Sequence, residues 1–257
     1  MAKIIAVTNQ KGGVGKTTTT VNLSACLAAA GKRVLLVDVD PQGNASSGLG
    51  RPGQEGKTLY EVLINGINGS DAVTQTCCEN LFLLPASIEL AGAEIELVGM
   101  SGREHMLKNA LSDLVDPYDY ILMDCPPSLG LLTLNALSAA DSVLVPIQCE
   151  YYALEGVGQL MNTLQLVRKR LNPDLLVEGV LLTMLDGRTN LGVQVVDEVK
   201  KHFRDRVFST IIPRNVRLGE APSHGIPIHM YDARCNGTVA YQELAAEVID
   251  RNEGSDW

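Results

Sequence analysis

Short, uninterrupted apolar runs alternate along the chain with longer segments of helical spacing. The runs predict strands at residues 4–8, 34–38, 81–85, 120–124, 142–147, 177–185 and 207–213. Helices are predicted over residues 16–30, about 154–171 and about 238–250. Strands with so little alternation are buried on both faces. The pattern therefore predicts an α/β fold, a doubly wound, mostly parallel sheet with helices on both faces.

The chain reads as one domain. It has no internal repeat and no linker rich in Pro, Gly or Ser, and 46% of its 257 residues are hydrophobic, which is enough to bury one large core. We therefore expect a single domain over residues 1–257. The segment from about 48 to 75 has many glycines and few long apolar runs, so it is expected to lie at the edge of the sheet.

A glycine-rich segment, QKGGVGKTTTT at residues 10–20, follows the first predicted strand. Its ending, Gly15, Lys16 and Thr17, matches the phosphate-binding pattern G-x-x-x-x-G-K-[ST], although Gln10 replaces the first glycine. Backbone N–H groups of such a loop close around phosphate oxygens, with support from the positive end of the following helix. Lys16 is expected to reach the terminal phosphates, and the Thr17 hydroxyl to bind Mg²⁺ directly.

Acidic residues occur at the ends of two other predicted strands. Asp124 ends the strand YILMD, as expected of a carboxylate that holds Mg²⁺ through water. Asp38 and Asp40 lie in DVDPQGN after a buried strand, where a carboxylate can orient the attacking water or sense the metal. Parallel sheets bind ligands beyond the carboxyl ends of their strands, so these acids are expected to converge on the phosphate loop.

These motifs together resemble a known family. KGGVGKT with Lys11, DVDPQGN and DCPPSLG are similar to the deviant Walker A ATPases, which have the P-loop NTPase fold. Within that group, CEYYALEG (149–156), GVLLTMLDGRTNLG (179–192) and IPRNVRLGEAPSHG (212–225) resemble the ParA/Soj chromosome-partitioning proteins. The similarity extends over nearly the whole chain.

The resemblance implies roles for individual residues. Lys11 crosses to the nucleotide of a partner subunit in a sandwich dimer that forms with ATP, and Gly12 permits close approach of the two loops. Asp40 positions the water for a slow hydrolysis, and Asp38 supports the Mg²⁺ region. The loop residues Gly13, Val14 and Thr18 complete the nucleotide site, and Pro213 and Asn215 match an adenine-contacting turn.

The same resemblance implies function and partners. The expected function is a partitioning ATPase whose ATP-bound homodimer binds double-stranded DNA without sequence preference. A partner similar to the ParB/Spo0J centromere-binding proteins stimulates hydrolysis and releases the dimer. Two alternatives stay open, a MinD-like positioning ATPase and a deviant Walker A metabolic synthetase. A MinD-like membrane helix is not expected, because the end YQELAAEVIDRNEGSDW is acidic.

Charge is distributed unevenly along the chain. The net charge is −9, yet residues 168–218 carry ten of the 21 lysines and arginines. We expect this segment to bind DNA phosphates in a salt-sensitive way. Arg188 and Arg217 match DNA-binding positions of the family, and Lys200 and Lys201 are further candidates, although a basic helix such as VKKHFRDR is often only a solvated face.

Cysteine usage and the N-terminus indicate a location. None of the six cysteines is paired at C-x-x-C spacing, which disfavours a zinc site, and the N-terminus lacks the layout of a signal peptide. No apolar run reaches the ~18 residues of a membrane span. A cytoplasmic protein with reduced thiols is therefore expected. The DNA binding that the resemblance implies would make it nucleoid-associated, with ATP and Mg²⁺ as cofactors.

Overall fold

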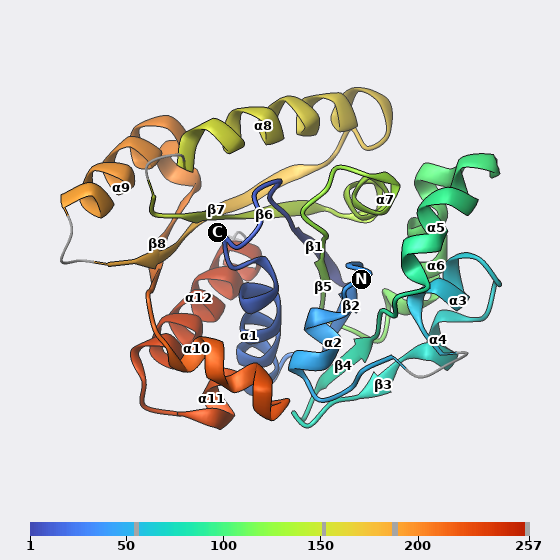
Figure 1. Cartoon of the computed structure of the whole chain (residues 1–257), viewed down its shortest axis with the longest axis horizontal. Helices are drawn as coiled ribbons and strands as arrows, with labels where there is room; N and C mark the ends of the chain where they lie inside the picture. The colour runs from blue at the N-terminus through green and yellow to red at the C-terminus, as the bar shows by residue number, and fades with distance from the viewer. Residues whose placement is uncertain (54–56, 151–152, 187–189, 255–257) are drawn as a thin grey trace.

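A computed structural model describes residues 1–53, 57–150, 153–186 and 190–254. Within them, eight strands form one sheet in the order β3-β4-β2-β5-β1-β6-β7-β8 (Figure 1). All neighbours pair in parallel except β3, which runs antiparallel to β4. The strands are β1 (Lys3–Val7), β2 (Val34–Asp38), β3 (Thr74–Gln75), β4 (Leu81–Leu84), β5 (Tyr120–Asp124), β6 (Ser142–Gln148), β7 (Leu176–Leu185) and β8 (Val207–Pro213).

Helices connect these strands and cover the sheet. They are α1 (Lys16–Ala29), α2 (Asn44–Gly48), α3 (Leu59–Leu63), α4 (Gly69–Ala72), α5 (Leu90–Glu96), α6 (Met106–Leu111), α7 (Leu131–Ala139), α8 (Ala153–Arg170), α9 (Asn190–Phe203), α10 (Arg217–Glu220), α11 (Ile228–Tyr231) and α12 (Asn236–Glu253). Short 3-10 turns lie at Leu97–Gly99, Arg103–His105, Ser112–Leu114, Arg204–Arg206 and Ala221–His224. None of the helices in the described residues is both long and apolar enough to cross a bilayer.

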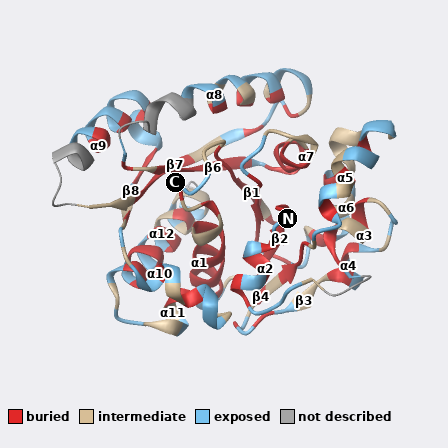
Figure 2. Cartoon of the chain, viewed as in Figure 1, coloured by how far each residue is buried: buried red, intermediate tan, exposed pale blue. Residues whose placement is uncertain are grey.

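Alternate residues of each central strand enter two separate cores. In β1, Ile4 and Ala6 pack with helices α3 to α9, whereas Ile5 and Val7 pack with α1, α10, α11 and α12. Figure 2 shows the strands buried between these helices, whose outer surfaces are exposed. Because both faces of the sheet are covered, its central strands β2 and β5 are apolar up to the acidic residue that ends each of them. The predicted fold class is therefore confirmed.

Most predicted elements agree with the structure within a few residues. The ranges 34–38, 120–124 and 207–213 match β2, β5 and β8, and the last helix is longer than predicted. The expected excursion at 48–75 contains the short helices α3 and α4 and ends in β3. Since β3 pairs only with β4, this segment does lie at the sheet edge, as predicted.

Candidate functional site

Strand register brings the predicted site residues to one point. Asp124, the last residue of β5, pairs with Val7 at the end of β1 and with Asp38 at the end of β2. The glycine-rich loop leaves β1 at this same position and enters α1. Side chains from three neighbouring strands and one helix therefore converge at the carboxyl edge of the sheet, as the sequence predicts.

Hydrogen bonds with residues outside the glycine-rich loop fix its conformation. Asn9 Nδ2 donates to Pro146 O at 2.7 Å, and Asn9 Oδ1 accepts from Lys11 N at 3.1 Å. On the other side, Thr183 Oγ1 donates to Val14 O at 2.8 Å. Gly15 has a φ of 89°, in the left-handed region where glycine is favoured, immediately before α1 begins. These contacts fix a turn whose remaining N–H groups are available to an anion.

A cavity of about 410 Å³ lies above this loop. Its size falls within the range of ~300–1,000 Å³ typical of small-molecule sites. The lining residues combine the predicted loop with the two acidic-strand turns: Gly12, Gly13, Gly15, Lys16, Thr17, Thr18, Asp40, Gln42, Asn44, Pro127 and Met184. The structure thus places the loop, Lys16 and Asp40 around one space.

Lys16 is the buried cation of this cavity. Only 7% of the residue is exposed, and its Nζ lies 3.4 Å from Lys11 O. Burial lowers the pKa of the Lys16 ammonium, and the negative charges of Asp124 and Asp40 act in the opposite direction. A buried ammonium group in a glycine-rich loop is suited to bind phosphate, which would supply the missing negative charge.

Asp124 has the properties of a second-layer magnesium carboxylate. It is fully buried, and its Oδ1 accepts a hydrogen bond from Thr20 Oγ1 at 3.0 Å. Its Oδ2 has no hydrogen-bond partner among the described residues. Burial, and then the nearby charge of Asp38, raise the pKa of the Asp124 carboxyl. The hydroxyls of Thr17 and Thr20 act against this pKa shift, which places the carboxylate beside the Thr17 end of α1, where a hydrated Mg²⁺ would fit.

Asp38 organises the turn that carries Asp40. Its Oδ2 accepts from Ser46 N at 2.8 Å and from Ser46 Oγ at 2.6 Å, and its Oδ1 accepts from Asp40 N at 3.3 Å. Burial raises the pKa of Asp38, although the Ser46 hydrogen bonds act against this shift. Asp40 Oδ1 accepts from Gln42 N at 3.0 Å, and Asp40 lines the cavity.

A smaller cavity of about 210 Å³ adjoins the first and shares Gly15, Thr18 and Met184 with it. Pro213 and Asn215, the residues expected near adenine, line this second space together with Ile212, Leu218 and Tyr241. Asn215 Oδ1 also accepts from Arg217 N at 2.8 Å and so begins the turn into α10. An apolar space beside a phosphate loop is the shape required by a nucleotide base.

Several residues of the site escaped the sequence analysis. Thr183 and Met184 lie near the end of β7, and Met184 has a φ of 53°, an uncommon conformation for a residue with a side chain. Thr20 also contacts Asp124, and its spacing from Thr17 on α1 was the available signal, since residues three apart share a helix face. Nothing in the local pattern singled out Met184.

Three of the basic residues expected to bind DNA come from helices on opposite faces of the sheet. Lys200 and Lys201 are exposed in the last turn of α9, which packs on one face of the sheet, whereas Arg217 begins α10 on the other face (Figure 1). Lys201 Nζ lies 3.6 Å from Glu198 Oε2, and Arg217 pairs with Glu220 at 2.9 Å. Arg188 lies outside the described residues.

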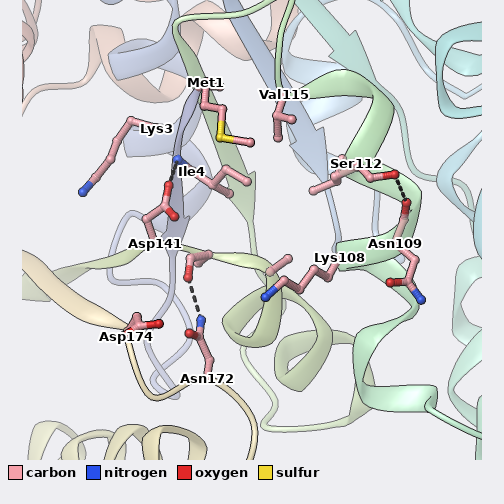
Figure 3. Close-up of a pocket in the computed structure, with 14 residues that line it drawn as sticks. Met1, Lys3, Ile4, Lys108, Asn109, Ser112, Val115, Asp141, Asn172 and Asp174 are labelled. Atoms are coloured by element: carbon pink, nitrogen blue, oxygen red, sulfur yellow. Dashed lines mark hydrogen bonds between the residues drawn. The ribbon is translucent and has the colours of Figure 1, made fainter.

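A larger cavity, of about 700 Å³, lies at the opposite edge of the sheet (Figure 3). Two of its polar side chains form hydrogen bonds with nearby backbone groups. Asp141 Oδ2 accepts from Ile4 N at 2.8 Å, and Asn172 Nδ2 donates to Ala140 O at 2.7 Å. It has no glycine-rich loop, so size alone does not locate the functional site of this molecule.

A glycine-rich loop between a central strand and its helix, with a buried lysine and carboxylates at the ends of the neighbouring strands, defines a P-loop nucleotide-binding protein. Comparisons with known proteins narrow this class. A family described as "AAA domain" matches residues 2–177. The chain is 64% identical over 249 residues to the sporulation initiation inhibitor protein Soj of Bacillus subtilis, covering 96% of this chain and 98% of Soj.

Two further relatives agree. Over 253 residues the chain is 54% identical to the chromosome partitioning protein ParA of Myxococcus xanthus, covering 98% of this chain and 89% of that protein. A solved structure of cobyrinic acid a,c-diamide synthase from Mycobacterium smegmatis, with bound ATP analog and magnesium, superposes with a TM-score of 0.87 at 40% identity, covering 98% and 96% of the two chains. The chain belongs to the family of the ParA and Soj chromosome-partitioning ATPases, which confirms the resemblance. The nucleotide and magnesium bound by that synthase agree with the predicted cofactors, ATP and Mg²⁺.

Proposed function

We propose that residues 1–257 form a single ATPase domain that partitions chromosomes or plasmids. With ATP and Mg²⁺, two copies pair in a sandwich dimer that binds double-stranded DNA without sequence preference. Hydrolysis is slow by itself, is accelerated by a ParB/Spo0J-like protein, and releases the dimer from DNA. The protein acts as a switch in the cytoplasm, on the nucleoid. The identity with Soj and ParA over almost the whole chain supports this function.

One observation carries the dimer proposal, namely that the two loop lysines differ in position. Lys16 lines the phosphate cavity of its own chain, whereas Lys11 is not among the described residues that line it. The Lys11 side chain is 36% exposed, and its Nζ lies 3.7 Å from Glu150 Oε2, outside the loop. Because the Lys11 ammonium group does not line the cavity of its own chain, it is available to a nucleotide bound by a second copy.

The Lys11–Glu150 pair would be easy to exchange. Exposed ion pairs contribute at most about 1 kcal/mol, because water screens them. A hydrogen bond from an ammonium group to a γ-phosphate, closed off from water between two subunits, is charge-assisted and much stronger. Binding of ATP by the partner would therefore move Lys11 from Glu150 to the phosphate. ADP lacks the γ-phosphate, so pairing would depend on the nucleotide.

Gly12 supports the same arrangement from the steric side. Among the described residues, a Cβ at Gly12 would meet no atom within 4 Å, and the residue has no positive φ. The isolated chain therefore gives no reason for a glycine at this position. Close approach by a second loop would give one, since a side chain would then stand between the two copies.

Each side chain has a place in the proposed hydrolysis. Lys16 and the loop N–H groups hold the phosphates, and Lys11 of the partner adds positive charge where negative charge develops. Asp40 orients the attacking water. Thr17 would hold Mg²⁺ directly, and Asp124 would hold it through water. Asp38 keeps the Asp40 turn in position through Ser46. When bound, Mg²⁺ neutralises the charge of the β- and γ-phosphate oxygens.

DNA binding is proposed for Arg217, Arg188, Lys200 and Lys201. Because α9 and α10 lie on different faces of one chain, the contacts of a dimer would be discontinuous along the duplex. Phosphate contacts add up wherever they occur, so each neutralised phosphate would steepen the salt dependence by ~0.9. No base-reading motif supports sequence specificity.

A second candidate is a metabolic synthetase, which phosphorylates a carboxylate substrate. The likeness to the Mycobacterium smegmatis protein, by its name a diamide synthase, favours it, although the identity is 40% against 64% for Soj. The two functions differ in what accelerates ATP turnover. DNA together with a ParB-like protein would stimulate the switch, whereas cobyrinic acid would stimulate the synthetase.

Mass measurement by light scattering tests the proposed function most directly. Wild-type protein should be a monomer alone or with ADP, and a dimer with a non-hydrolysable ATP analogue and Mg²⁺. Lys11→Ala should remain a monomer with the analogue while binding it normally. Lys32→Ala, which removes a surface lysine paired with Glu253 at 2.7 Å, is the matched control and should dimerise. A nucleotide-independent dimer, or full dimerisation of Lys11→Ala, would refute the proposal.

A further inference from the structure

Three sulfur atoms lie near one another where the turn between β3 and β4 meets α11. Cys77 and Cys78 form the turn between β3 and β4, and Met230 lies in α11. The Sγ atoms of the two cysteines are 3.9 Å apart, and Cys78 Sγ lies 3.5 Å from Met230 Sδ. Two segments separated by about half of the chain thus present two thiols and a thioether to one another.

We propose that Cys77, Cys78 and Met230 form a binding site for a soft monovalent cation of the Cu(I) class. Thiolate and thioether sulfur are the ligands that Cu(I) prefers. Metal–thiolate bonds are about 2.3 Å long, so three sulfurs around one ion in a plane stand about 4 Å apart. The two separations from Cys78 Sγ, 3.9 Å to Cys77 Sγ and 3.5 Å to Met230 Sδ, lie within about half an ångström of that spacing.

Zinc and a disulfide fit these residues less well. Structural zinc takes four ligands from Cys, His, Asp and Glu. No group of three such residues that could hold a metal occurs in the described part of the chain, and a thioether does not substitute for one. Disulfides need Cα atoms at least about 4.4 Å apart, whereas consecutive Cα atoms are about 3.8 Å apart. The adjacent cysteines are therefore poorly placed to bond to each other.

The cluster is accessible to an ion from solvent. Cys77 is exposed and Met230 is 46% exposed, whereas Cys78 is buried beneath them. Burial, followed by the neighbouring Cys77, raises the pKa of the Cys78 thiol to about 12, so without a metal this thiol keeps its proton. Binding of one Cu(I) would form two thiolate bonds and release two thiol protons to water, with no change of oxidation state.

A bound ion would join the sheet edge to the helix of the phosphate loop. Met230 belongs to α11, and the first residue of that helix, Ile228, donates from its N–H to Asn22 Oδ1 on α1 at 2.7 Å. Asn22 Nδ2 donates in turn to Thr18 O at 2.8 Å, beside the nucleotide cavity. The ion should therefore stabilise the folded chain as well as the local turn.

Anaerobic titration of the full chain with Cu(I) in the presence of a chromophoric Cu(I) chelator tests the site. We expect one tightly bound Cu(I) per chain and three sulfur neighbours in the X-ray absorption spectrum. Cys77→Ser and Cys78→Ser should each lose at least about tenfold in affinity, and Met230→Leu should lose less while reducing the sulfur count to two. Thermal unfolding should shift upward with Cu(I) in wild type, and not in Cys77→Ser or Cys78→Ser.

Cys235→Ser is the matched control, because Cys235 is a partly exposed cysteine whose Sγ pairs with Thr238 Oγ1 at 3.5 Å and is not part of the sulfur cluster. It should bind Cu(I) as wild type does, and circular dichroism of each metal-free variant should be unchanged. Equal affinity of wild type and the Cys77→Ser, Cys78→Ser double variant would overturn the proposal. A higher affinity of the site for Zn²⁺ than for Cu(I) would overturn the choice of ion, and with it the proposed Cu(I) site.

Discussion

The carboxylates of Asp38 and Asp124 end adjacent parallel strands in register, and both residues are fully buried. Two negative charges on neighbouring residues repel each other, and burial disfavours the charged form of both carboxylates. Ser46 satisfies Asp38, but Asp124 retains an oxygen without a donor in the described residues. The pair stores unfavourable electrostatic energy that a divalent cation would relieve.

The first prediction concerns stability and pH. Burial and Asp38 raise the pKa of Asp124 in the folded chain above its unfolded value of about 3.9. The folded state then holds more protons than the unfolded state, so the free energy of unfolding falls as pH rises from that value through the folded pKa. Urea unfolding of nucleotide-free protein between pH 5 and 8 should show this decline, and Asp124→Asn should reduce it. A stability that rises over this range would contradict the assignment.

A second prediction concerns Thr20, whose hydroxyl orients Asp124. Thr20→Val keeps the shape but removes the donor, so the Mg²⁺ concentration needed for half-maximal ATP hydrolysis should rise by roughly tenfold. Thr20→Ser restores the donor and should restore the wild-type Mg²⁺ requirement. If Val and Ser variants need the same Mg²⁺ concentration, the hydroxyl serves only the packing of α1.

The third prediction separates hydrolysis from dimerisation. Asp40→Ala should still dimerise with ATP and remain on DNA, while its turnover falls by about 10²–10⁴-fold, the contribution typical of a positioned acid or base. Asp40→Asn keeps an acceptor for Gln42 N, so it isolates the loss of charge from the loss of the turn. Normal turnover in both variants would show that another group positions the water.

A fourth prediction uses Gly12. Gly12→Val should leave folding and the thermal midpoint unchanged, since a side chain there meets nothing in the described chain, yet it should abolish ATP-dependent pairing. Gly99→Val is the control, because Gly99 has equally open surroundings and no positive φ but lies far from the loop. Light scattering reports pairing in both. Dimerisation of Gly12→Val would mean that the two loops do not approach closely.

The fifth prediction concerns DNA. Arg217→Ala should weaken DNA binding and reduce the salt slope by about one, while nucleotide affinity stays unchanged. The variant loses only exposed ion pairs with Glu220 and Asp232, so folding should be intact. Fluorescence anisotropy at several salt concentrations measures both quantities. Loss of nucleotide affinity as well would assign Arg217 to the base-binding turn that begins at Asn215.

Strand positions and the phosphate site were predictable because each depends on local pattern. An apolar run ending in an acid, as in β2 and β5, indicates both a buried strand and the edge at which ligands bind. The left-handed backbone conformation of Met184 and the hydrogen bond from Thr183 to the loop depend on how β7 packs in the sheet. No local sequence pattern predicts this packing. The arrangement of the basic segment was not predictable for a similar reason, since α9 and α10, which are close in sequence, cover opposite faces of the sheet.

The position of β1 has a consequence for biosynthesis. Lys3 of β1 pairs with Tyr120, and Ile5 pairs with Ser142. The strand that is translated first therefore pairs only with strands that are translated much later. The loop after it reaches its final shape only once Pro146 and Thr183 have arrived to hold it. A nascent chain, or one cut short, therefore has the whole loop sequence and no place for a nucleotide. Nucleotide binding is therefore possible only after the chain has been synthesised and folded.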